Sequence, residues 1–584
     1  GTHILVFGQT GAGKTESTMR PLAYEIRKTM KAGALILDGK GSLVDELRSL
    51  MDLVIEPGVS FGLIDGMSAT DVSTCFGQAI KGSDNGKDSV WTGGANLLQQ
   101  HATTIVEALC QQEKAIKAYR LSKVEQFECD LHWLEMESAR KGRLGEAIDG
   151  TEAKIKELRG IRDSWLELAL LPRKWPWTVS SIARFLNLMN NLVPVDRDVW
   201  DFGPEIKEAF ALLGWNLPPD SPRHQHPQSI HPDIGRHGPL DASLTYLNTE
   251  WLAMAPEQRS SFFLNVTNLI QPLLRGAMLT NAQGIPWHMI EKGEDVTRCL
   301  RGEFVGVDLP EVQFGEAGTL VANLVKQRIY AEIKKRKGEQ STWPEGHLPM
   351  MLMIDEAQLL VGDEERKFLP IARSLGMMAV FATQTIEGLL AQFRSEADTK
   401  HFCGTFQSNI CLDTSIATLE FVSRRLGHAE LVSFKSPTFG LDYAGGVVNL
   451  AHAAMSDLSH PSSAGLRLVE ERGGGQFEIA VPALRGHNQS EWRELRDVKS
   501  IEDAASTAHV KVPVGGIKEM QPVLSVEEMT SLLREKGMAV VVLNRAGTPR
   551  VDIAKLNRLS EAEARKLPRI ARSKEIPTNQ EKTA

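Results

Sequence analysis

Short, continuous apolar runs separate the longer helical segments of this chain. Such runs lie at residues 4–7, 34–38 and 349–354, with no alternation of polar and apolar positions inside them. They are typical of parallel strands that are covered on both faces. Further strands are expected at residues 376–385 and 404–414. Because helical patterns lie between these strands, we expect an α/β fold with a mostly parallel central sheet.

One long segment between the strands has helical spacing throughout. Apolar residues recur every three or four positions over residues 95–121 and 124–171, with Glu and Lys neighbours between them. Proline-rich breaks at 172–176 and 217–240 interrupt this pattern, which resumes at 256–276. The pattern predicts a large all-helical domain inserted into the core.

These changes of pattern predict six parts. They are a core at residues 1–66 and 306–435, an inserted helical domain at 67–305, a loop-rich extension at 436–515, core-closing strands at 516–557 and a charged tail at 558–584.

Composition narrows the class of protein only slightly. The 584 residues allow two to four domains, and a net charge of -8 neither favours nor excludes a nucleic-acid partner. Six cysteines without a C-x-x-C spacing indicate reduced thiols. No apolar run is long enough to cross a bilayer, and we expect a segment to precede the first residue, since the first strand begins so early.

The sequence GQTGAGKT directly follows the first apolar run and precedes a helical pattern. Glycines at these places let successive backbone N–H groups surround phosphate oxygens at a helix N-terminus. We expect Lys14 to reach the β- and γ-phosphates and the Thr15 hydroxyl to bind Mg²⁺. A structural glycine loop is the alternative. The predicted nucleotide-binding residues are Gly8, Gln9, Thr10, Gly11, Ala12, Gly13, Lys14 and Thr15.

A second metal ligand is expected at the end of another buried strand. The run at residues 349–354 ends in Asp355 and Glu356. We expect Asp355 to hold Mg²⁺ and Glu356 to act as the general base that polarises the attacking water. The alternative is that these acids only cap the following helix.

Two other side chains are candidates for catalysis. The strand at 376–385 ends in Thr383 and Gln384, and Gln384 is placed to sense the γ-phosphate or position water. Arg373 follows a helix, where it can reach the nucleotide of a neighbouring subunit and stabilise transition-state charge in trans. The alternatives are a polar strand cap for Gln384 and a solvated helix residue for Arg373.

Two unusual segments lie inside the helical insertion. The first, residues 224–237, contains four histidines and Asp233, but its prolines and irregular spacing favour a loop over a metal site. The second, RKWPW at 173–177, mixes cations with tryptophans that can stack on bases, although packing anchors are the alternative.

In combination, these motifs resemble the conjugative DNA-transfer ATPases, the coupling proteins of type IV secretion systems. The segments that carry the resemblance are GQTGAGKT, LILDGKGSLVDEL, DSVWTGGANLL, MLMIDEAQLL, FATQT and FQSNICLDT followed by TLEFVSRRLG.

The resemblance implies a RecA-like P-loop motor that assembles as a homo-hexamer. It implies single-stranded DNA, relaxase or relaxosome proteins and inner-membrane secretion components as partners. It also implies a place at the cytoplasmic face of the bacterial inner membrane, with the anchor in a preceding segment, and an in-trans arginine at Arg373. ATP with Mg²⁺ is favoured over GTP because no Asn-Lys-x-Asp motif occurs.

Three functions remain open at this stage. The leading one is an ATP-driven pump for single-stranded DNA or a DNA–relaxase complex. The second is a docking receptor for secreted protein effectors, with nucleotide controlling assembly. The third is a double-stranded DNA translocase of the chromosome-segregation type, although no C-terminal winged-helix pattern supports it.

Overall fold

The computed structural model describes most of the chain. The described residues are 3–29, 31–83, 89–144, 149–196, 199–201, 203–213, 238–276, 278–433, 467–470, 477–480, 517–545 and 548–556. The histidine-rich segment 224–237 and the tail 558–584 lie outside them, as does most of the extension predicted at 436–515.

A nine-stranded sheet lies largely in the first of two compact units, which comprises residues 1–53, 299–306 and 338–584. In spatial order its strands are β15 (Thr548–Lys555), β14 (Met538–Arg545), β9 (Ser408–Cys411), β1 (Ile4–Phe7), β8 (Met377–Thr383), β7 (Met350–Asp355), β2 (Gly33–Asp38), β6 (Phe304–Val307) and β3 (Leu53–Ile55).

The five central strands, from β9 to β2, are parallel. All six residues of β2 and all six of β7 are buried, which explains why these segments are apolar without alternation. β14 pairs antiparallel with β9 and with β15, so these last strands form one edge of the sheet. The predicted α/β fold with a mostly parallel central sheet is confirmed.

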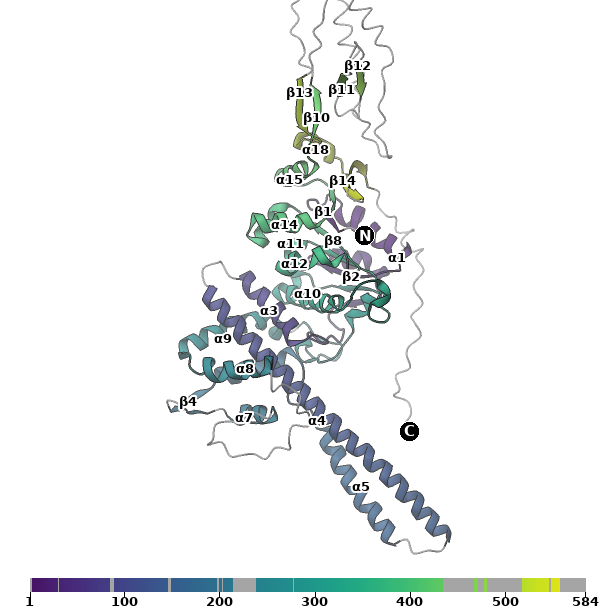
Figure 1. Ribbon diagram of the computed structural model, residues 1–584, viewed down its shortest axis with the longest axis vertical. Coiled ribbons are helices and arrows are strands. Elements are labelled where there is room, and N and C mark those ends of the chain that lie inside the picture. Colours follow the sequence, from purple (N-terminus) through teal and green to yellow (C-terminus); the bar gives the residue numbers. More distant parts are fainter. Residues whose placement is uncertain are drawn as a thin grey trace, which may run out of the picture. The chain divides into compact units, whose positions relative to one another are not determined.

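Helices surround this sheet (Figure 1). After β1 the chain forms one π-helical turn, Lys14–Met19, which continues as α1 (Arg20–Thr29). The other helices of this unit are α2 (Ser42–Leu47), α11 (Ala357–Leu360), α12 (Asp363–Ala372), α13 (Ile386–Phe393), α14 (Glu396–Thr405), α15 (Ile416–Leu426) and α18 (Val526–Leu533). Two small antiparallel pairs complete it, β10 (His428–Ser433) with β13 (Ile517–Pro522), and β11 (Arg467–Glu470) with β12 (Phe477–Ala480).

The second unit, residues 54–298 and 307–337, is mainly helical. Its helices are α3 (Ala69–Ser83), α4 (Ser89–Leu144), α5 (Asp149–Leu170), α6 (Val179–Asn190), α7 (Gly203–Leu212), α8 (Pro239–Tyr246), α9 (Pro256–Arg275) and α10 (Glu311–Lys334). A short pair, β4 (Val193–Asp196) with β5 (Val199–Asp201), is its small sheet. This unit includes residues 307–337, which the sequence pattern assigned to the core, and the predicted domain boundaries stay predictions.

A long helical hairpin belongs to the second unit. α5 lies along the distal part of the 56-residue α4 (Figure 1). Arg159 of α5 donates a hydrogen bond to Glu135 of α4 at 2.6 Å, between side chains that are both about half exposed. Among the described residues, no helix is long and apolar enough to span a membrane.

Candidate nucleotide-binding site

The segment after β1 forms a loop whose backbone requires glycine. Gly11 and Gly13 have positive φ values of 87° and 101°, a conformation that side chains disfavour. A Cβ atom on Gly13 would also lie 3.0 Å from the Ser17 hydroxyl. The Gly8 N–H donates to the Thr383 carbonyl at 3.1 Å, and the Gln9 N–H donates to the Asp413 carbonyl at 2.7 Å. The loop is therefore fixed at the carboxyl ends of the neighbouring strands.

Lys14 is buried at the start of the helix that follows the loop, with 6% of its surface exposed. Its Nζ donates a hydrogen bond to the Gly8 carbonyl at 2.7 Å and lies 3.9 Å from Glu356 Oε1. Burial lowers the pKa of Lys14, because desolvation disfavours the charged ammonium, while Glu356 and Asp355 raise it in part. The ammonium group is therefore held inside the cleft, beside the acids.

The Thr15 hydroxyl and Asp355 lie together although 340 positions separate them in sequence. Thr15 Oγ1 donates to Asp355 Oδ2 at 3.1 Å. Asp355 ends β7 and is almost fully buried, and it lies in register with Asp38 of β2. Burial raises the pKa of Asp355 to about 6, with a further contribution from the charge of Asp38. A cation at this place would relieve the cost of the buried charge.

Glu356 has an unusual backbone and many partners. Its φ of 52° and ψ of 51° place it in the left-handed region, where a residue with a long side chain is strained. Its carboxylate accepts hydrogen bonds from Lys40 at 2.5 Å and from Gln358 at 2.6 Å. Burial raises the pKa of Glu356, but these hydrogen bonds and the charge of Lys14 outweigh it, so the net pKa is lowered. The carboxylate is ionised and aimed by its partners.

Gln384 reaches the same carboxylate. Its Nε2 donates to Glu356 Oε2 at 3.1 Å. The backbone carbonyl of Gln384 accepts a hydrogen bond from the Thr414 hydroxyl at 2.8 Å. Thr383, one residue earlier, donates to the Gln358 side chain at 2.8 Å. The end of β8 is therefore linked to the acids at the end of β7.

Arg373 lies away from the side chains of the nucleotide cleft. It lies after α12, is exposed, and donates to the Gln407 side chain at 3.3 Å. It precedes β8, whereas the phosphate loop lies beyond the carboxyl ends of the parallel strands. The structure thus brings Lys14, Thr15, Asp355, Glu356 and Gln384 together, but it does not bring Arg373 to the cleft of its own chain.

Sequence reasoning missed several members of this cleft. The segment LILDGKG was expected to supply a buried strand and part of the resemblance, but no role was predicted for its Asp38 or Lys40. Asp38 Oδ1 accepts the Lys40 N–H at 2.8 Å, which shapes the turn after β2. Two apolar runs that each end in an acid were a usable signal, since adjacent parallel strands end at the same edge of the sheet. Nothing comparable marked Lys536, which also lines the cleft.

The donor set fits a magnesium nucleotide. The cleft has a volume of about 200 Å³ and contains the glycine loop, Lys14, the Thr15 hydroxyl and the carboxylates of Asp355 and Glu356. A hydroxyl and a carboxylate are oxygen ligands of the kind Mg²⁺ prefers. Backbone amides with glycine geometry at a helix start suit phosphate oxygens.

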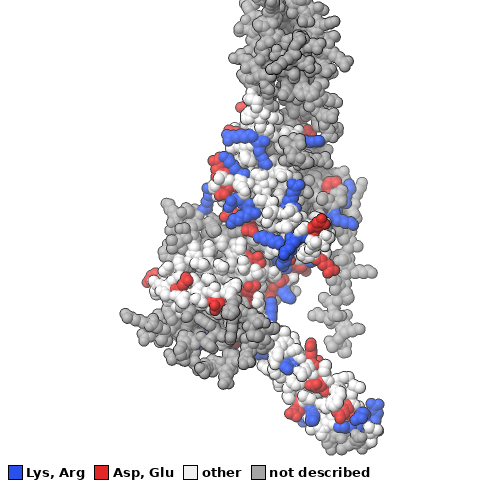
Figure 2. Space-filling model, in the orientation of Figure 1, with Lys and Arg blue, Asp and Glu red and all other residues white. Residues whose placement is uncertain are grey.

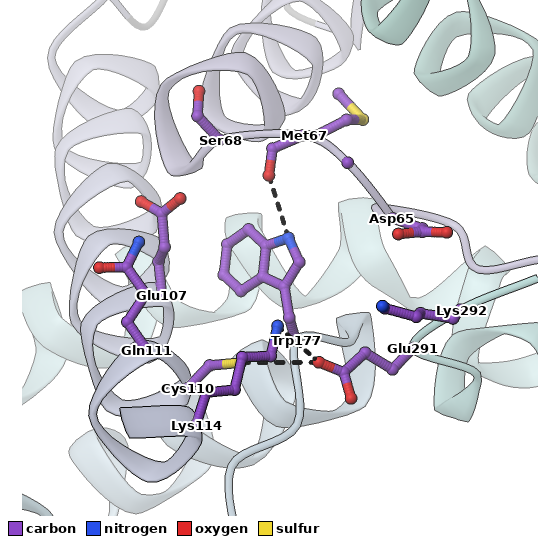
Figure 3. Close-up of a pocket in the computed structure, with 11 residues that line it drawn as sticks. Asp65, Met67, Ser68, Glu107, Cys110, Gln111, Lys114, Trp177, Glu291 and Lys292 are labelled. Atoms are coloured by element: carbon purple, nitrogen blue, oxygen red, sulfur yellow. Dashed lines mark hydrogen bonds and ion pairs between the residues drawn. The ribbon is translucent and has the colours of Figure 1, made fainter. Parts of the chain in front are cut away.

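A second pocket, of about 400 Å³, lies in the helical unit and explains the RKWPW segment (Figure 3). Trp175 and Trp177 are both buried, and Trp177 lies in the middle of the pocket view. The Trp177 Nε1 donates to the Ile64 and Met67 carbonyls, each at 3.1 Å. These tryptophans act as packing anchors at this place.

Glu291 forms a charged cluster at the side of this pocket. It accepts hydrogen bonds from Arg173, one of them at 2.9 Å, and pairs with Lys114 at 3.0 Å. Burial raises the pKa of Glu291, but the bonds from Arg173 and Lys114 prevail and lower it to about 2. The cluster joins α4, the loop before α6 and the segment after α9.

The glycine loop after β1 and the acids at the end of β7 define a P-loop cleft at the edge of a mostly parallel sheet. Residues 349–442 match the family model described as the TraM recognition site of TraD and TraG. This segment includes Asp355, Glu356, Arg373 and Gln384, and over it the predicted resemblance to the coupling proteins is confirmed.

Solved structures resemble the chain at low identity. The bacterial conjugative coupling protein TrwBdeltaN70 is 12% identical with a TM-score of 0.46, covering 96% of this chain and 85% of that one. TrwB in complex with ADP and Mg²⁺ is 11% identical with a TM-score of 0.45, and the coverages are 96% and 86%. VirB4 of Thermoanaerobacter pseudethanolicus is 12% identical with a TM-score of 0.34, covering 82% and 88%. No curated protein matches the chain.

Proposed function

We propose that this protein binds ATP with Mg²⁺ and hydrolyses it. The observation that carries the proposal is the meeting of Thr15 with Asp355 at 3.1 Å, beside Lys14 and Glu356 at 3.9 Å. These side chains come from opposite ends of a segment of more than three hundred residues. A bound magnesium ion would neutralise charge that develops on the phosphoryl oxygens.

The chain's own residues have distinct roles in this proposal. The Thr15 hydroxyl and Asp355 hold the metal, and Lys14 binds phosphate oxygens as a cation. Glu356 would accept a proton from the attacking water as the water oxygen bonds to the γ-phosphorus and the bond from that phosphorus to the bridging oxygen breaks, with ADP as the leaving group. Gln384, which donates to Glu356, positions either that carboxylate or the water.

We further propose that hydrolysis drives the transfer of single-stranded DNA, or of a DNA–relaxase complex, as in coupling proteins. The family match over residues 349–442 supports this proposal. The proposal includes a homo-hexamer at the cytoplasmic face of the inner membrane, where it works with other type IV secretion components. Figure 2 shows Lys and Arg mixed with Asp and Glu over the described residues on the visible face, so we place DNA contacts in a local path.

Arg373 has its role in the assembled ring. It is exposed and away from its own cleft, a placement that suits contact with the nucleotide of a neighbouring subunit. We expect Arg373→Ala to abolish turnover in the assembled protein while leaving nucleotide binding by single subunits intact.

The test is the rate of phosphate release as a function of protein concentration and added single-stranded DNA. We expect the rate per subunit to rise with both, and Lys14→Ala to abolish it. A rate that responds to neither would contradict the motor. Hydrolysis that duplex DNA stimulates and single strands do not would instead favour the double-stranded translocase.

A docking receptor remains the second candidate, since the matched family model describes a recognition site for another protein, TraM. In this case nucleotide controls only assembly. Binding of a DNA-processing protein with unchanged affinity to the Lys14→Ala variant would favour it, provided that wild-type hydrolysis is insensitive to that partner.

A further inference from the structure

Lys536 is a cation of the nucleotide cleft that neither the sequence motifs nor the family match assigns. It lies in the turn between α18 (Val526–Leu533) and β14 (Met538–Arg545), more than five hundred residues after the phosphate loop. It nevertheless lines the cleft together with the loop residues Gln9, Thr10 and Gly11.

The direction of β14 explains this position. β14 runs antiparallel to β9, with Val541 opposite Ile410, whereas β9 runs parallel to β1. The amino end of β14 therefore lies at the same edge of the sheet as the carboxyl end of β1, where the phosphate loop begins. Gly537, with a φ of 88°, allows the chain to turn into the strand at this place.

The turn is held from both sides. The Ser423 hydroxyl of α15 donates to the Leu524 carbonyl just before α18 at 2.6 Å, in a buried position. Ser525 and Glu528 form a capping box that fixes the start of α18. At the other end, Lys555 of β15 pairs with Glu535 at 2.5 Å. Glu535, which precedes Lys536, is therefore paired with Lys555, and its charge is balanced by that lysine.

The other lysines of the cleft are occupied. Lys14 donates to the Gly8 carbonyl, and Lys40 pairs with Glu356 at 2.5 Å. Lys536 is exposed, and among the described residues it has no hydrogen-bond or ion-pair partner. A cation that lines a phosphate-binding cleft without a partner of its own is suited to an anionic ligand.

The strand order indicates which end of the nucleotide Lys536 meets. The acids that mark the γ-phosphate end follow β7, which lies two strands from β1 on one side. β14 lies two strands from β1 on the other side. A nucleotide whose terminal phosphate lies toward Asp355 and Glu356 therefore directs its ribose and α-phosphate toward Lys536.

We propose that Lys536 contacts the ribose and α-phosphate side of the bound nucleotide, so that α18 and β14 form a wall of the site. This inference rests on the proposed nucleotide binding. It adds a binding residue from the last strands of the sheet, beyond the motifs of the P-loop core. Since the contact is the same for ATP and ADP, it contributes to affinity and not to the chemical step.

The experiment measures the Kd of ADP with Mg²⁺ and of a non-hydrolysable ATP analogue with Mg²⁺, by calorimetry at low ionic strength. For Lys536→Ala we expect both Kd values to rise by the same factor, about tenfold, as for loss of one charge-assisted hydrogen bond. Lys536→Arg should keep most of the affinity. In steady-state hydrolysis, KM should rise while kcat stays unchanged.

Arg534→Ala is the matched control. Arg534 lies in the same exposed turn and has the same charge, but it does not line the cleft. Its Kd values should equal those of the wild type. Equal weakening by both variants would show a general charge effect and overturn the proposal, as would unchanged binding in Lys536→Ala. Weakening of the ATP analogue alone would place Lys536 at the γ-phosphate and also overturn it.

Lys14→Ala separates the inference from the proposed function. If Lys14→Ala loses binding while Lys536→Ala binds like the wild type, only the inference fails. If the wild type binds neither nucleotide, the proposed function fails and the inference with it. Because Lys536 is exposed, its replacement should leave the thermal midpoint of unfolding unchanged, which a melting curve checks.

Discussion

Two glutamates, one in each unit, are held by cations, but only one shows the signs of a reactive group. Glu356 is bound by Lys40 and two amides, and Glu291 by Arg173 and Lys114. Both carboxylates have lowered pKa values. Charge pairing and burial alone therefore do not distinguish a catalytic site from a structural one.

The difference lies in the backbone and in the kind of cation that holds each carboxylate. Among the described residues, Glu356 and Arg394 are the only ones other than glycine with a positive φ. Strain of this kind costs about 1–3 kcal/mol and persists where the surrounding structure imposes it. Glu291 is held in part by a planar, bidentate guanidinium, which suits a fixed structural contact. The strained glutamate is therefore the candidate for chemistry.

Of the changes at these two glutamates, Glu356→Gln should have the largest effect. Loss of the general base should reduce the rate of hydrolysis by about 10²–10³-fold, while nucleotide binding persists because Lys14 and the loop remain. Phosphate release and calorimetric binding measure the two quantities. Glu291→Gln is the control and should keep the turnover rate per folded molecule. A Glu356→Gln variant that retains more than a tenth of wild-type turnover would remove Glu356 from this role.

Glu291→Gln should instead act on stability. It leaves Arg173 and Lys114 without their anion, which should reduce the free energy of unfolding of the helical unit by about 2–3 kcal/mol. Urea unfolding followed by tryptophan fluorescence measures this change. Glu135→Gln, which breaks an exposed pair with Arg159, should cost less than about 0.5 kcal/mol. If Glu291→Gln and Glu135→Gln reduced the free energy of unfolding equally, the Glu291 cluster would stabilise the protein no more than an exposed ion pair does.

The pH dependence of stability should separate Glu291→Gln from the wild type. The folded-state pKa of Glu291, about 2, lies below the usual value of 4.5. Its contribution is therefore present above pH 4.5 and is lost as pH falls toward 2. The wild type should lose stability over this window, and Glu291→Gln should lose less. Parallel curves for the two proteins would contradict the assignment.

Asp355→Asn should change the free energy of unfolding less than Glu291→Gln does, by about 1 kcal/mol. The folded-state pKa of Asp355, about 6, lies above its usual 3.8, so the buried charge begins to destabilise the folded state as pH rises above 3.8 and does so fully above pH 6. Without nucleotide, Asp355→Asn should therefore be more stable than the wild type at pH 8, and this difference should shrink as pH falls and disappear only below pH 3.8. It should also lose Mg²⁺-dependent nucleotide binding. A variant that is less stable at pH 8 would contradict this account.

Much of the core was predictable because its signals are local. The phosphate loop has glycines where positive φ is needed, and β7 is apolar at every position before its acid. Gln384 was predictable from its place at a strand end. The position of Lys536 in the nucleotide cleft was not predictable, because it depends on the antiparallel pairing of β14 with β9, which no sequence periodicity encodes. The partner of Arg173 was hidden for a similar reason, since 118 positions separate it from Glu291.

The placement of β1 has a consequence for biosynthesis. β1 is a central strand whose neighbours are β8 and β9, so that Ile4 pairs with Val380 and with Ser408. A ribosome adds roughly 5–20 residues per second, so both edges of β1 stay unpaired for on the order of half a minute after it emerges. During that interval an apolar strand with two open edges is prone to aggregation. The nascent chain is therefore expected to depend on chaperones that cover this strand until its neighbours have been translated.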